Sequence, residues 1–344
     1  MIEDVVWAVP PGKKANARPK KLIEALVQIG QVSESVRTFF HGRDRSNDEE
    51  SALGVAAPSL VLYRKLREER EDSSRRELSV LTPVAVPCRL LSRIWTDLYD
   101  DWSIARDISP VHRGYSAVTY EMVKRRGSGV PSLGVVTCNS EYMRRKLRLP
   151  TESLVPNGVD ASLASLDTSG DGRRRLVILG HFMQHRTDYQ LISRVVRLGQ
   201  FDQVVIGEPG RSAQMRRTIL GFDGKTDVVL RDWMTPEELT RYVGSRTVGF
   251  LPHLVNDYTM SQDAMKVYQF LALGMKVIAP RMLWPSHIGR ENGLLLDFGI
   301  NLRAALDEWV EIPGLTLTNR RKFADQNSWE RRAEAIGELI MGEH

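Results

Sequence analysis

The sequence predicts an α/β protein with two doubly wound parallel sheets, each in a domain of its own. The chain of 344 residues is too long for one ordinary core and suits two domains of about 150 to 170 residues. Short β-branched runs alternate with helix-length segments in both halves, which is typical of parallel strands joined by crossover helices. With 42% hydrophobic and 26% charged residues, the chain can bury enough apolar surface to offset its conformational entropy.

The first half is predicted to contain four strands, with helices between some of them. Strands are expected at 5–10, 36–40, 93–99 and 134–140. Helices are expected in ARPKKLIEALVQIG, which ends at Gly30, and in SEYMRRKLRL, where Ser140 can cap the first turn. The charged run at 64–78 is expected to be a solvated helix or a mobile loop.

The second half is predicted to contain another sheet, with strands that are apolar almost throughout because helices cover both faces. These strands are expected at 175–180, 203–207, 227–233, 247–252 and 276–280. In TPEELTRYVG, Thr235 is expected to cap a helix and Pro236 to take its first position. Between the halves, residues 156–171 combine a turn-forming PNGVD with small and polar residues, which is typical of a linker.

Charge and composition exclude several function classes. Lys and Arg outnumber Asp and Glu by only 48 to 43, which suits a phosphate-bearing ligand or an anionic membrane surface without singling out either. Nucleic-acid binding would predict a denser basic stripe with interleaved aromatic residues, which the sequence lacks. No apolar run approaches the ~20 residues that span a bilayer, and the amino terminus lacks the charge order of a signal peptide.

Cysteine and histidine usage argues against metal or disulfide chemistry. Cys88 and Cys138 have no metal-ligand spacing, so we expect a reduced cytoplasmic protein, with peripheral contact at the inner face of a membrane left open. The seven histidines are scattered, and neither HExxH nor CxxC occurs. The adjacent Asp100 and Asp101 do not form the DxD pattern of metal-dependent transferases. We therefore expect neither a metal nor a cofactor.

The segment DAMKVYQFLALGMKVIAP places polar side chains on an otherwise apolar helix. If 263–272 is helical, Lys266, Gln269 and Phe270 share one face, while other apolar residues pack on the sheet. The start of such a helix offers backbone amides and a positive dipole end to a phosphate, Lys266 adds a full charge, and Gln269 can hydrogen-bond a ribose hydroxyl. We expect a nucleoside diphosphate here; the alternative is a surface lysine and glutamine on an amphipathic helix.

The order of these motifs resembles the carboxyl-terminal half of glycosyltransferases with the GT-B fold. The resemblance rests on PNGVD, ILGHF, LPHLVNDYTMSQDAMKVYQFLALGMKVIAP and NSWERRAEAIGELI. Many members of this fold carry a glutamate where this chain has Gln269. The arrangement of Met265, Lys266 and Gln269 is more similar to the xanthan glucuronosyltransferase and its relatives. This resemblance implies that these three residues contact the uridine diphosphate part of a sugar donor.

The GT-B resemblance also implies a domain plan, with two Rossmann-like domains facing across a cleft. Residues 1–155 would bind the acceptor and residues 172–322 the nucleotide sugar, with 156–171 as the linker. Residues 323–344 would form a last helix that crosses back to the first domain.

Three loops at the carboxyl ends of strands supply further candidate residues for donor binding. Gly180 is expected to let the backbone approach a phosphate, although one glycine is a weak signal. The remaining candidates are His181, Met183 and Arg186 after the first strand, Arg231 and Trp233 after the third, and Thr259 and Ser261 after the fourth. His185 or Arg186 could simply face water, and Trp233 could stack on the base or pack under its loop.

The first half offers a candidate base and a candidate acceptor loop. Asp101, with Asp100 as the alternate, follows a predicted strand and is expected to deprotonate the acceptor hydroxyl. The alternative for Asp101 is to cap the following helix. Gly12 and Lys13 are expected to meet an anionic or lipid-linked acceptor, or to belong to a solvated basic loop.

The predicted function is transfer of a sugar from a nucleoside-diphosphate sugar, UDP-linked by resemblance, to a hydroxyl of a sugar, a lipid-linked or a small-molecule acceptor. Inversion without a metal is preferred, although retaining enzymes share this fold. The rivals are a nucleotide-sugar epimerase, a transferase-like enzyme that couples non-sugar units, and a two-lobed small-molecule binding protein.

Overall fold

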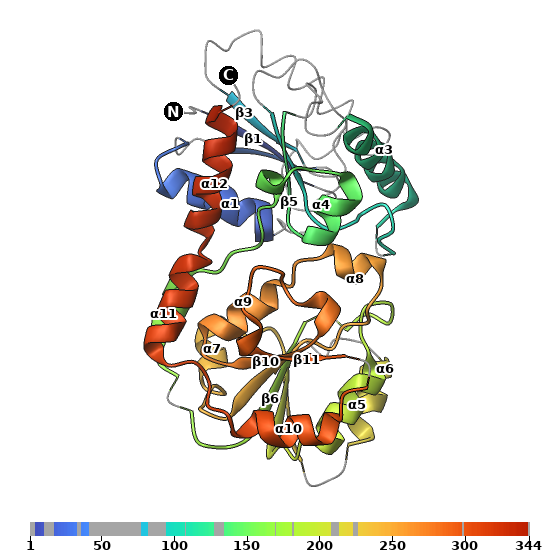
Figure 1. Cartoon of the computed structure of the whole chain (residues 1–344), viewed down its shortest axis with the longest axis vertical. Coiled ribbons are helices and arrows are strands. Elements are labelled where there is room, and N and C mark those ends of the chain that lie inside the picture. The colour runs from blue at the N-terminus through green and yellow to red at the C-terminus, as the bar shows by residue number, and fades with distance from the viewer. Residues whose placement is uncertain are drawn as a thin grey trace, which may run out of the picture. The chain divides into compact units, whose positions relative to one another are not determined.

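The structure is a computed structural model, and Figure 1 shows the course of the chain. It describes residues 4–9, 17–32, 36–40, 77–81, 94–106, 108–126, 134–168, 170–180, 182–207, 213–222, 226–297 and 299–342. The chain divides into two compact units, which we call unit 1 (Met1–Pro156 with Trp329–His344) and unit 2 (Asn157–Ser328).

The described residues of unit 1 form a parallel five-stranded sheet in the order β2-β1-β3-β4-β5. The strands are β1 (Asp4–Val9), β2 (Val36–Phe40), β3 (Glu77–Leu81), β4 (Ile94–Leu98) and β5 (Val135–Cys138). The helical segments described in this unit are α1 (Ala17–Gln28), α3 (Pro110–Arg126), α4 (Glu141–Leu147), η2 (Thr151–Ser153) and α12 (Trp329–Gly342). Ser140 caps α4 as predicted, because its side chain accepts a hydrogen bond from the Met143 amide. Helix α12 packs on α1, so the carboxyl-terminal helix completes the amino-terminal unit.

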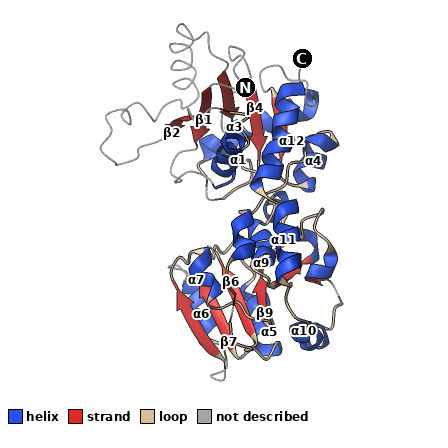
Figure 2. Cartoon of the chain, turned by 90° about the vertical axis from the view of Figure 1, so that its left-hand side faces the viewer, coloured by secondary structure: helices blue, strands red, loops and turns tan. Residues whose placement is uncertain are grey.

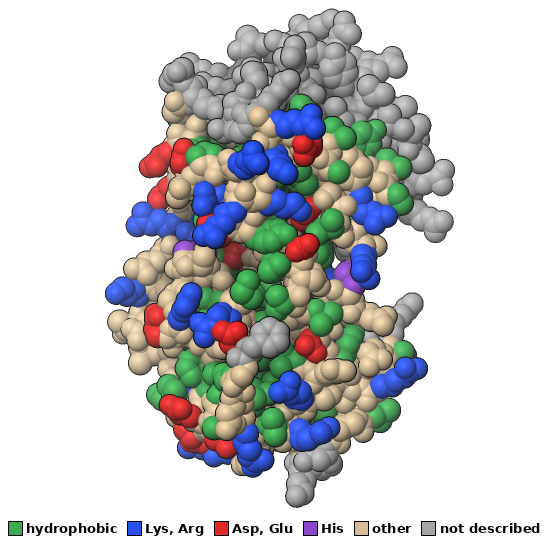
Figure 3. Space-filling model, turned by 45° about the vertical axis from the view of Figure 1, so that its right-hand side comes forward, with side chains coloured by type: hydrophobic (Ala, Val, Ile, Leu, Met, Phe, Trp, Pro, Cys, Tyr) green, Lys and Arg blue, Asp and Glu red, His purple; other side chains and the backbone are tan. Residues whose placement is uncertain are grey.

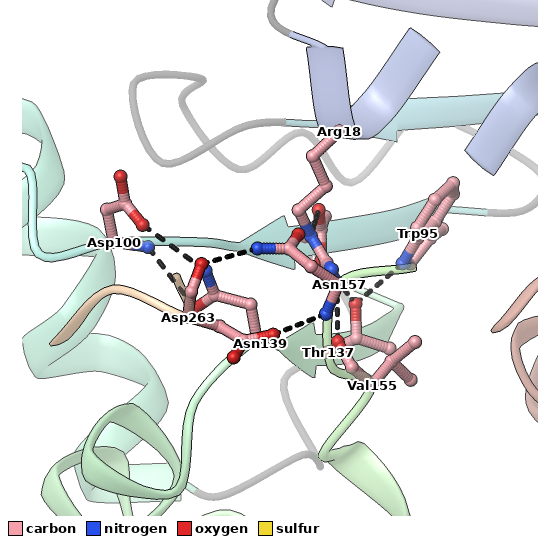
Figure 4. A network of polar contacts seen from close by, with 9 residues as sticks. Arg18, Trp95, Asp100, Thr137, Asn139, Val155, Asn157 and Asp263 are labelled. Atoms are coloured by element: carbon pink, nitrogen blue, oxygen red, sulfur yellow. Dashed lines mark hydrogen bonds and ion pairs between the residues drawn. The ribbon is translucent and has the colours of Figure 1, made fainter. Parts of the chain in front are cut away.

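A buried polar network ties α1 to this sheet (Figure 4). Arg18 donates two hydrogen bonds to the Asp97 carboxylate on β4, at 2.8 and 3.0 Å, and a third to the carbonyl of Val155 at 2.8 Å. Thr137 on β5 donates to the same carboxylate at 2.8 Å, and Trp95 donates to Thr137 at 2.9 Å. Arg18 and Asp97 are both almost fully buried, and such a pair is tolerable only because the hydrogen bonds satisfy both ions.

In the part of unit 2 that the structure describes, a parallel six-stranded sheet has the order β11-β10-β9-β6-β7-β8. The strands are β6 (Arg175–Leu179), β7 (Gln203–Gly207), β8 (Asp227–Arg231), β9 (Thr247–Phe250), β10 (Lys276–Pro280) and β11 (Gly293–Leu296). The chain runs outward from β6 to β8 and then returns to the other side of β6 at β9. The strand order therefore reverses between β6 and β9, which is where open α/β sheets bind ligands.

Helices cover both faces of this sheet, and Figure 2 shows unit 2 from the side. The helices are α5 (Tyr189–Leu198), α6 (Ala213–Leu220), α7 (Pro236–Thr240), α8 (Asp257–Ser261), α9 (Met265–Ala272), α10 (Leu302–Glu311) and α11 (Leu317–Gln326). Short 3-10 segments are described at η3 (Ala161–Ser165), η4 (Arg281–Leu283) and η5 (Arg290–Asn292).

Alternate strand residues enter two separate cores, as the period of a β-strand requires. Val177 packs in the cluster that includes α7, α9 and α11, whereas its neighbours Leu176 and Ile178 pack with α5, α6 and α10. All three side chains are fully buried. Burial on both faces explains why these strands read as continuous apolar runs.

The structure differs from the sequence prediction at several elements. Strands β3 and β11 were not predicted, and Glu77 and Leu78 of the charged run belong to β3. Residues 157–168 of the predicted linker belong to unit 2, where η3 packs on α9 and α11. The predicted last segment, 323–344, begins in the final turn of α11 in unit 2, and its helix is α12, which belongs to unit 1 as expected.

Within the described ranges, no helix is long and apolar enough to cross a membrane. On the face seen in Figure 3, acidic and basic side chains are interspersed rather than gathered into one basic stripe.

Candidate functional site

A pocket opens in unit 2 at the carboxyl ends of β6, β7 and β8. Several segments line it: Leu163 of η3, Leu179 and Gly180 at the end of β6, Gly207 of β7, residues 232–234, Pro236 and Leu239 of α7, Lys266 and Gln269 of α9, and Leu273 directly after α9. The lining is mainly apolar with a few polar groups, as is usual for a small-molecule site. It brings together four predicted residues: Gly180, Trp233, Lys266 and Gln269.

Helix α9 presents its polar side chains to this pocket. Val267, Tyr268, Phe270 and Leu271 are fully buried, whereas Lys266 and Gln269 are half-buried and line the pocket. The prediction that Phe270 shares their face is wrong, because its ring lies against Gly249 of β9, where an added Cβ would come within 2.3 Å of it. The N-cap residue Ala264 makes no side-chain cap hydrogen bond at the start of α9.

A buried hydrogen-bond network fixes the start of α9. The Asp263 carboxylate accepts from the backbone amide of Asn157 and from the hydroxyl of Tyr268, both at 2.6 Å. The Asn157 side chain in turn donates to the Asp263 carbonyl at 2.7 Å (Figure 4). The helix start is therefore held by the first residue of unit 2, a role that the PNGVD motif did not reveal.

Gly180 makes room for Lys266. Its φ of +133° is rarely adopted by L side chains, and an added Cβ would come within 2.9 Å of Lys266 Cε. The sequence led us to expect that Gly180 lets a phosphate approach the backbone. In the structure the space beside its Cα is occupied by the Lys266 side chain.

Trp233 stands at the rim of the pocket with 70% of its surface exposed. This exposure contradicts the alternative that the indole packs under its loop. A capping box at the start of α7 fixes the loop, since Thr235 and Glu238 bond each other's backbone amides at 3.2 and 2.9 Å. Arg231 does not line the pocket; it donates to the Tyr242 hydroxyl at 2.7 Å.

The loops after β6 and β9 meet where the strand order reverses. Thr187 and His253 form an isolated antiparallel bridge there, and Arg186 donates to Gln262 at 3.0 Å and lies over the Tyr258 ring. Burial lowers the pKa of His253 from 6.5 to about 3, and the positive charges of Arg186 and Lys266 push it the same way. His253 is therefore a neutral group beside two cations, and sequence reasoning had not selected it.

Other predicted donor contacts serve local structure. Thr259 completes a capping box with Asn256 at the start of α8, and the buried Ser261 hydroxyl donates to the Tyr258 carbonyl at 2.6 Å. Met183 and Met265 are half-buried and do not line the pocket. A donor role for these residues stays a prediction.

The remaining candidates lie in unit 1 or outside the described residues. Asp100 and Asp101 follow β4, with Asp100 partly exposed and Asp101 fully buried. The described residues contain no group of three or more His, Cys, Asp or Glu side chains that could hold a metal ion. Gly12, Lys13 and His181 lie outside the described residues.

Sequence reasoning missed most of the apolar wall. Leu163, Leu179, Met234 and Leu273 have no signature that separates a pocket wall from a core. Gly207 did carry a signal, a glycine that ends a predicted strand. An added Cβ there would come within 2.7 Å of the Leu179 side chain and 3.1 Å of the Met234 side chain. Because Gly207 has no side chain, these two residues can pack closely in the wall.

Comparisons with known proteins show what this fold is similar to. No protein-family model matches the chain, and no curated protein matches it in sequence. Among solved structures, AviGT4, a glycosyltransferase involved in avilamycin A biosynthesis, is 12% identical with a TM-score of 0.62, over 98% of this chain and 97% of that one. HepE of Anabaena, in complex with UDP-glucose, is 11% identical with a TM-score of 0.56, over 98% and 95%.

A third solved structure has a different activity. The UDP-GlcNAc 2-epimerase of Neisseria meningitidis, bound to UDP-GlcNAc, is 11% identical with a TM-score of 0.52, over the full length of both chains. Together with the two parallel sheets, these likenesses show that the chain has the GT-B fold.

Proposed function

We propose that the protein is a glycosyltransferase that moves a sugar from a nucleoside-diphosphate sugar to an acceptor hydroxyl. The observation that carries this proposal is the pocket of unit 2, where Lys266 and the uncapped start of α9 lie beside an apolar wall. An ammonium group and helix amides together suit a diphosphate, and an apolar wall suits a nucleobase.

Each part of the donor has a candidate partner. The diphosphate would lie against Lys266 and the start of α9, with Gln269 hydrogen-bonded to the ribose. The base would pack against the apolar wall and stack on the exposed ring of Trp233. The sugar would then point toward the loops that carry Arg186 and His253, where the strand order reverses.

A uridine nucleotide is the preferred donor. HepE and the Neisseria epimerase, which share the fold, are described as bound to UDP-glucose and UDP-GlcNAc. The resemblance of Met265, Lys266 and Gln269 to the xanthan glucuronosyltransferase supports the same nucleotide. The assays below identify the donor sugar and the acceptor, which is either free or carried by a lipid at a membrane surface.

The transfer would be inverting and would need no metal. One aspartate after β4 would take the proton of the acceptor hydroxyl as its oxygen attacks the anomeric carbon. The sugar–phosphate bond would break, and the positive end of α9 and Lys266 would stabilise the leaving diphosphate. Retaining transfer on the same fold is the nearest alternative.

Two assays test the proposal. In a thermal-shift panel of nucleoside diphosphates and their sugars, a uridine ligand should raise the melting temperature of the protein most. A ligand that binds only the folded chain stabilises it by mass action. Labelled UDP-sugars, with and without acceptors, should then yield a glycosylated acceptor.

A 2-epimerase is the second candidate, since one solved structure of this fold is such an enzyme. It would convert the labelled sugar without any acceptor. Binding without turnover would instead identify a small-molecule binding protein, and failure to bind any nucleotide would overturn the donor site.

A further inference from the structure

A series of hydrogen bonds runs from the segment after β10 to the residue that precedes the start of α9. It joins His287, Tyr268 and Asp263. We propose that Tyr268 and His287 are positioning residues of the donor site, which hold the first turn of α9 where it receives the diphosphate. This inference rests on the function proposed above and concerns unit 2 alone.

Asp263 is a buried carboxylate that depends on its donors. The residue is 8% exposed, and its Oδ2 accepts from the Asn157 amide and from the Tyr268 hydroxyl, both at 2.6 Å. Such hydrogen bonds to a carboxylate are charge-assisted, and a buried carboxylate that loses a donor is costly. Asp263 directly precedes Ala264, the N-cap residue of α9. Its donors therefore fix the place where the helix begins.

The Tyr268 hydroxyl links this carboxylate to His287. Tyr268 is fully buried, and its hydroxyl has one proton, which it donates to Asp263. The hydroxyl therefore accepts from Nε2 of His287, which lies 3.1 Å away, so the imidazole carries a proton on that nitrogen. The negative charge of Asp263 thus sets the direction of both hydrogen bonds.

His287 reaches Tyr268 from an exposed position between buried neighbours. Its ring stacks on the Tyr268 ring, with the centroids 5.7 Å apart and an angle of 30° between the planes. Trp284 and Ile288, on either side of it, are buried, and the Trp284 indole donates to the Ile288 carbonyl at 2.9 Å. These anchors hold the segment, so the exposed imidazole keeps a fixed place against the buried tyrosine.

The pocket side of α9 carries the groups that this network would place. Lys266 and Gln269 line the pocket, whereas Tyr268 and His287 do not. Because backbone hydrogen bonds tie the turns of a helix together, a displacement of the first residues of α9 moves the Lys266 side chain with them. Tyr268 and His287 touch no part of the donor in this scheme and act through Asp263 and the helix start.

Calorimetric titration of UDP tests the assignment by removing one hydroxyl. Tyr268→Phe keeps the buried ring, and it should weaken UDP binding by about 3- to 10-fold, the effect of one hydrogen bond. The matched control is Tyr120→Phe in unit 1, which loses a buried hydroxyl that donates to the Asp100 carbonyl at 2.8 Å and accepts from the Trp102 amide at 3.1 Å. The control should lower the melting temperature and bind UDP as wild type does.

His287 supplies a second variant at an exposed position, where a substitution leaves the fold intact. His287→Ala should weaken UDP binding by about 3-fold. His287→Gln should retain most of the wild-type affinity, because its carboxamide can still donate to the Tyr268 hydroxyl. The difference between these two variants separates the hydrogen bond from the bulk of the ring.

The route through α9 is tested by coupling to the charge that the helix carries. In the Lys266→Met background, Tyr268→Phe should weaken UDP binding by less than about twofold, because the group that it displaces is already gone. A network that only stabilises the fold would instead lower the melting temperature and leave the UDP affinity of both backgrounds unchanged.

Two results would overturn the assignment by itself. One is wild-type affinity for UDP in both Tyr268→Phe and His287→Ala. The other is a loss from Tyr268→Phe that is equal with and without Lys266. If the wild-type chain binds no nucleoside diphosphate, the proposed donor site fails and the assignment falls with it. Since these readouts are all binding, a chain that binds UDP and transfers no sugar contradicts the proposed function alone.

Discussion

At the residue scale, Gly180 and Lys266 form a pair in which the small residue makes room for the charged one. Gly180→Ala would add strain at φ +133° and a 2.9 Å contact with Lys266 Cε. We expect a loss of about 1–3 kcal/mol in unfolding free energy and weaker UDP binding, because the ammonium group must move. Urea unfolding and calorimetric titration measure the two effects.

The control for this substitution is Gly172→Ala, since an added Cβ at Gly172 meets nothing within 4 Å and its φ is not in the left-handed region. The contact can be isolated in a double-mutant cycle with Lys266→Ala, in which part of the Gly180→Ala cost should vanish. Full additivity would mean that the two side chains are not coupled.

His253 should make the stability of the folded chain depend on pH. Its folded pKa of about 3 lies below the ordinary 6.5, so the unfolded chain binds more protons between these values. The stability contributed by neutral His253 is therefore present above pH 6.5 and declines as the pH falls toward 3, by at most about 1.4 kcal/mol per pH unit. Urea unfolding between pH 7 and 4 measures the free energy of unfolding, which should fall less steeply with decreasing pH for His253→Gln than for wild type. Equal slopes would place the ring in solvent.

At the element scale, Arg320 of α11 holds two pocket-forming segments together. The buried guanidinium donates to the Ala272 carbonyl at the end of α9 at 3.0 Å and to the Leu163 and Leu166 carbonyls around η3 at 3.2 and 3.0 Å. Arg320→Met should cost about 3 kcal/mol or more, because it leaves buried carbonyls without donors. Arg321→Met, one residue along on the exposed side, should be nearly neutral. Equal losses in the two variants would refute this role.

Elements with a strong local pattern were predictable, and those without one were not. Long apolar runs predicted β6, β7, β9 and β10, and cap residues predicted the starts of α4 and α7. Strand β11 has four residues, and β3 follows a charged run, so neither shows enough periodicity to be recognised. Which lining residues meet depends on tertiary packing, as the burial of Phe270 against Gly249 illustrates.

At the scale of the whole molecule, the proposed donor pocket belongs to one unit. All of its lining residues lie within 157–328, and the two ends of that stretch are joined where the Val159 amide donates to the Asn327 carbonyl at 2.9 Å. A chain of residues 157–328 should therefore fold cooperatively and bind UDP within several-fold of the full chain's affinity. Circular dichroism melts and titration test this. An unfolded product, or a folded one that ignores UDP, would mean that unit 1 is needed for the site.

The sequence indicated two α/β halves and a nucleotide site in the second, because strand order and helix-start chemistry are local signals. It preferred Asp101 as the base, because adjacent carboxylates cannot be told apart without knowing which one the fold buries. In the structure Asp101 is fully buried and pairs with Lys146, whereas Asp100 is partly exposed and accepts a hydrogen bond from Asn139; a role as the base stays a prediction for both.

The most direct test of the central claim is calorimetric titration of UDP into wild type, Lys266→Met and the control Lys322→Met on the exposed face of α11. A diphosphate seated beside Lys266 predicts that Lys266→Met weakens binding by about 10- to 100-fold, the loss of a charge-assisted contact. Lys322→Met should bind as wild type does. Equal affinities in all three proteins would contradict the proposed donor site.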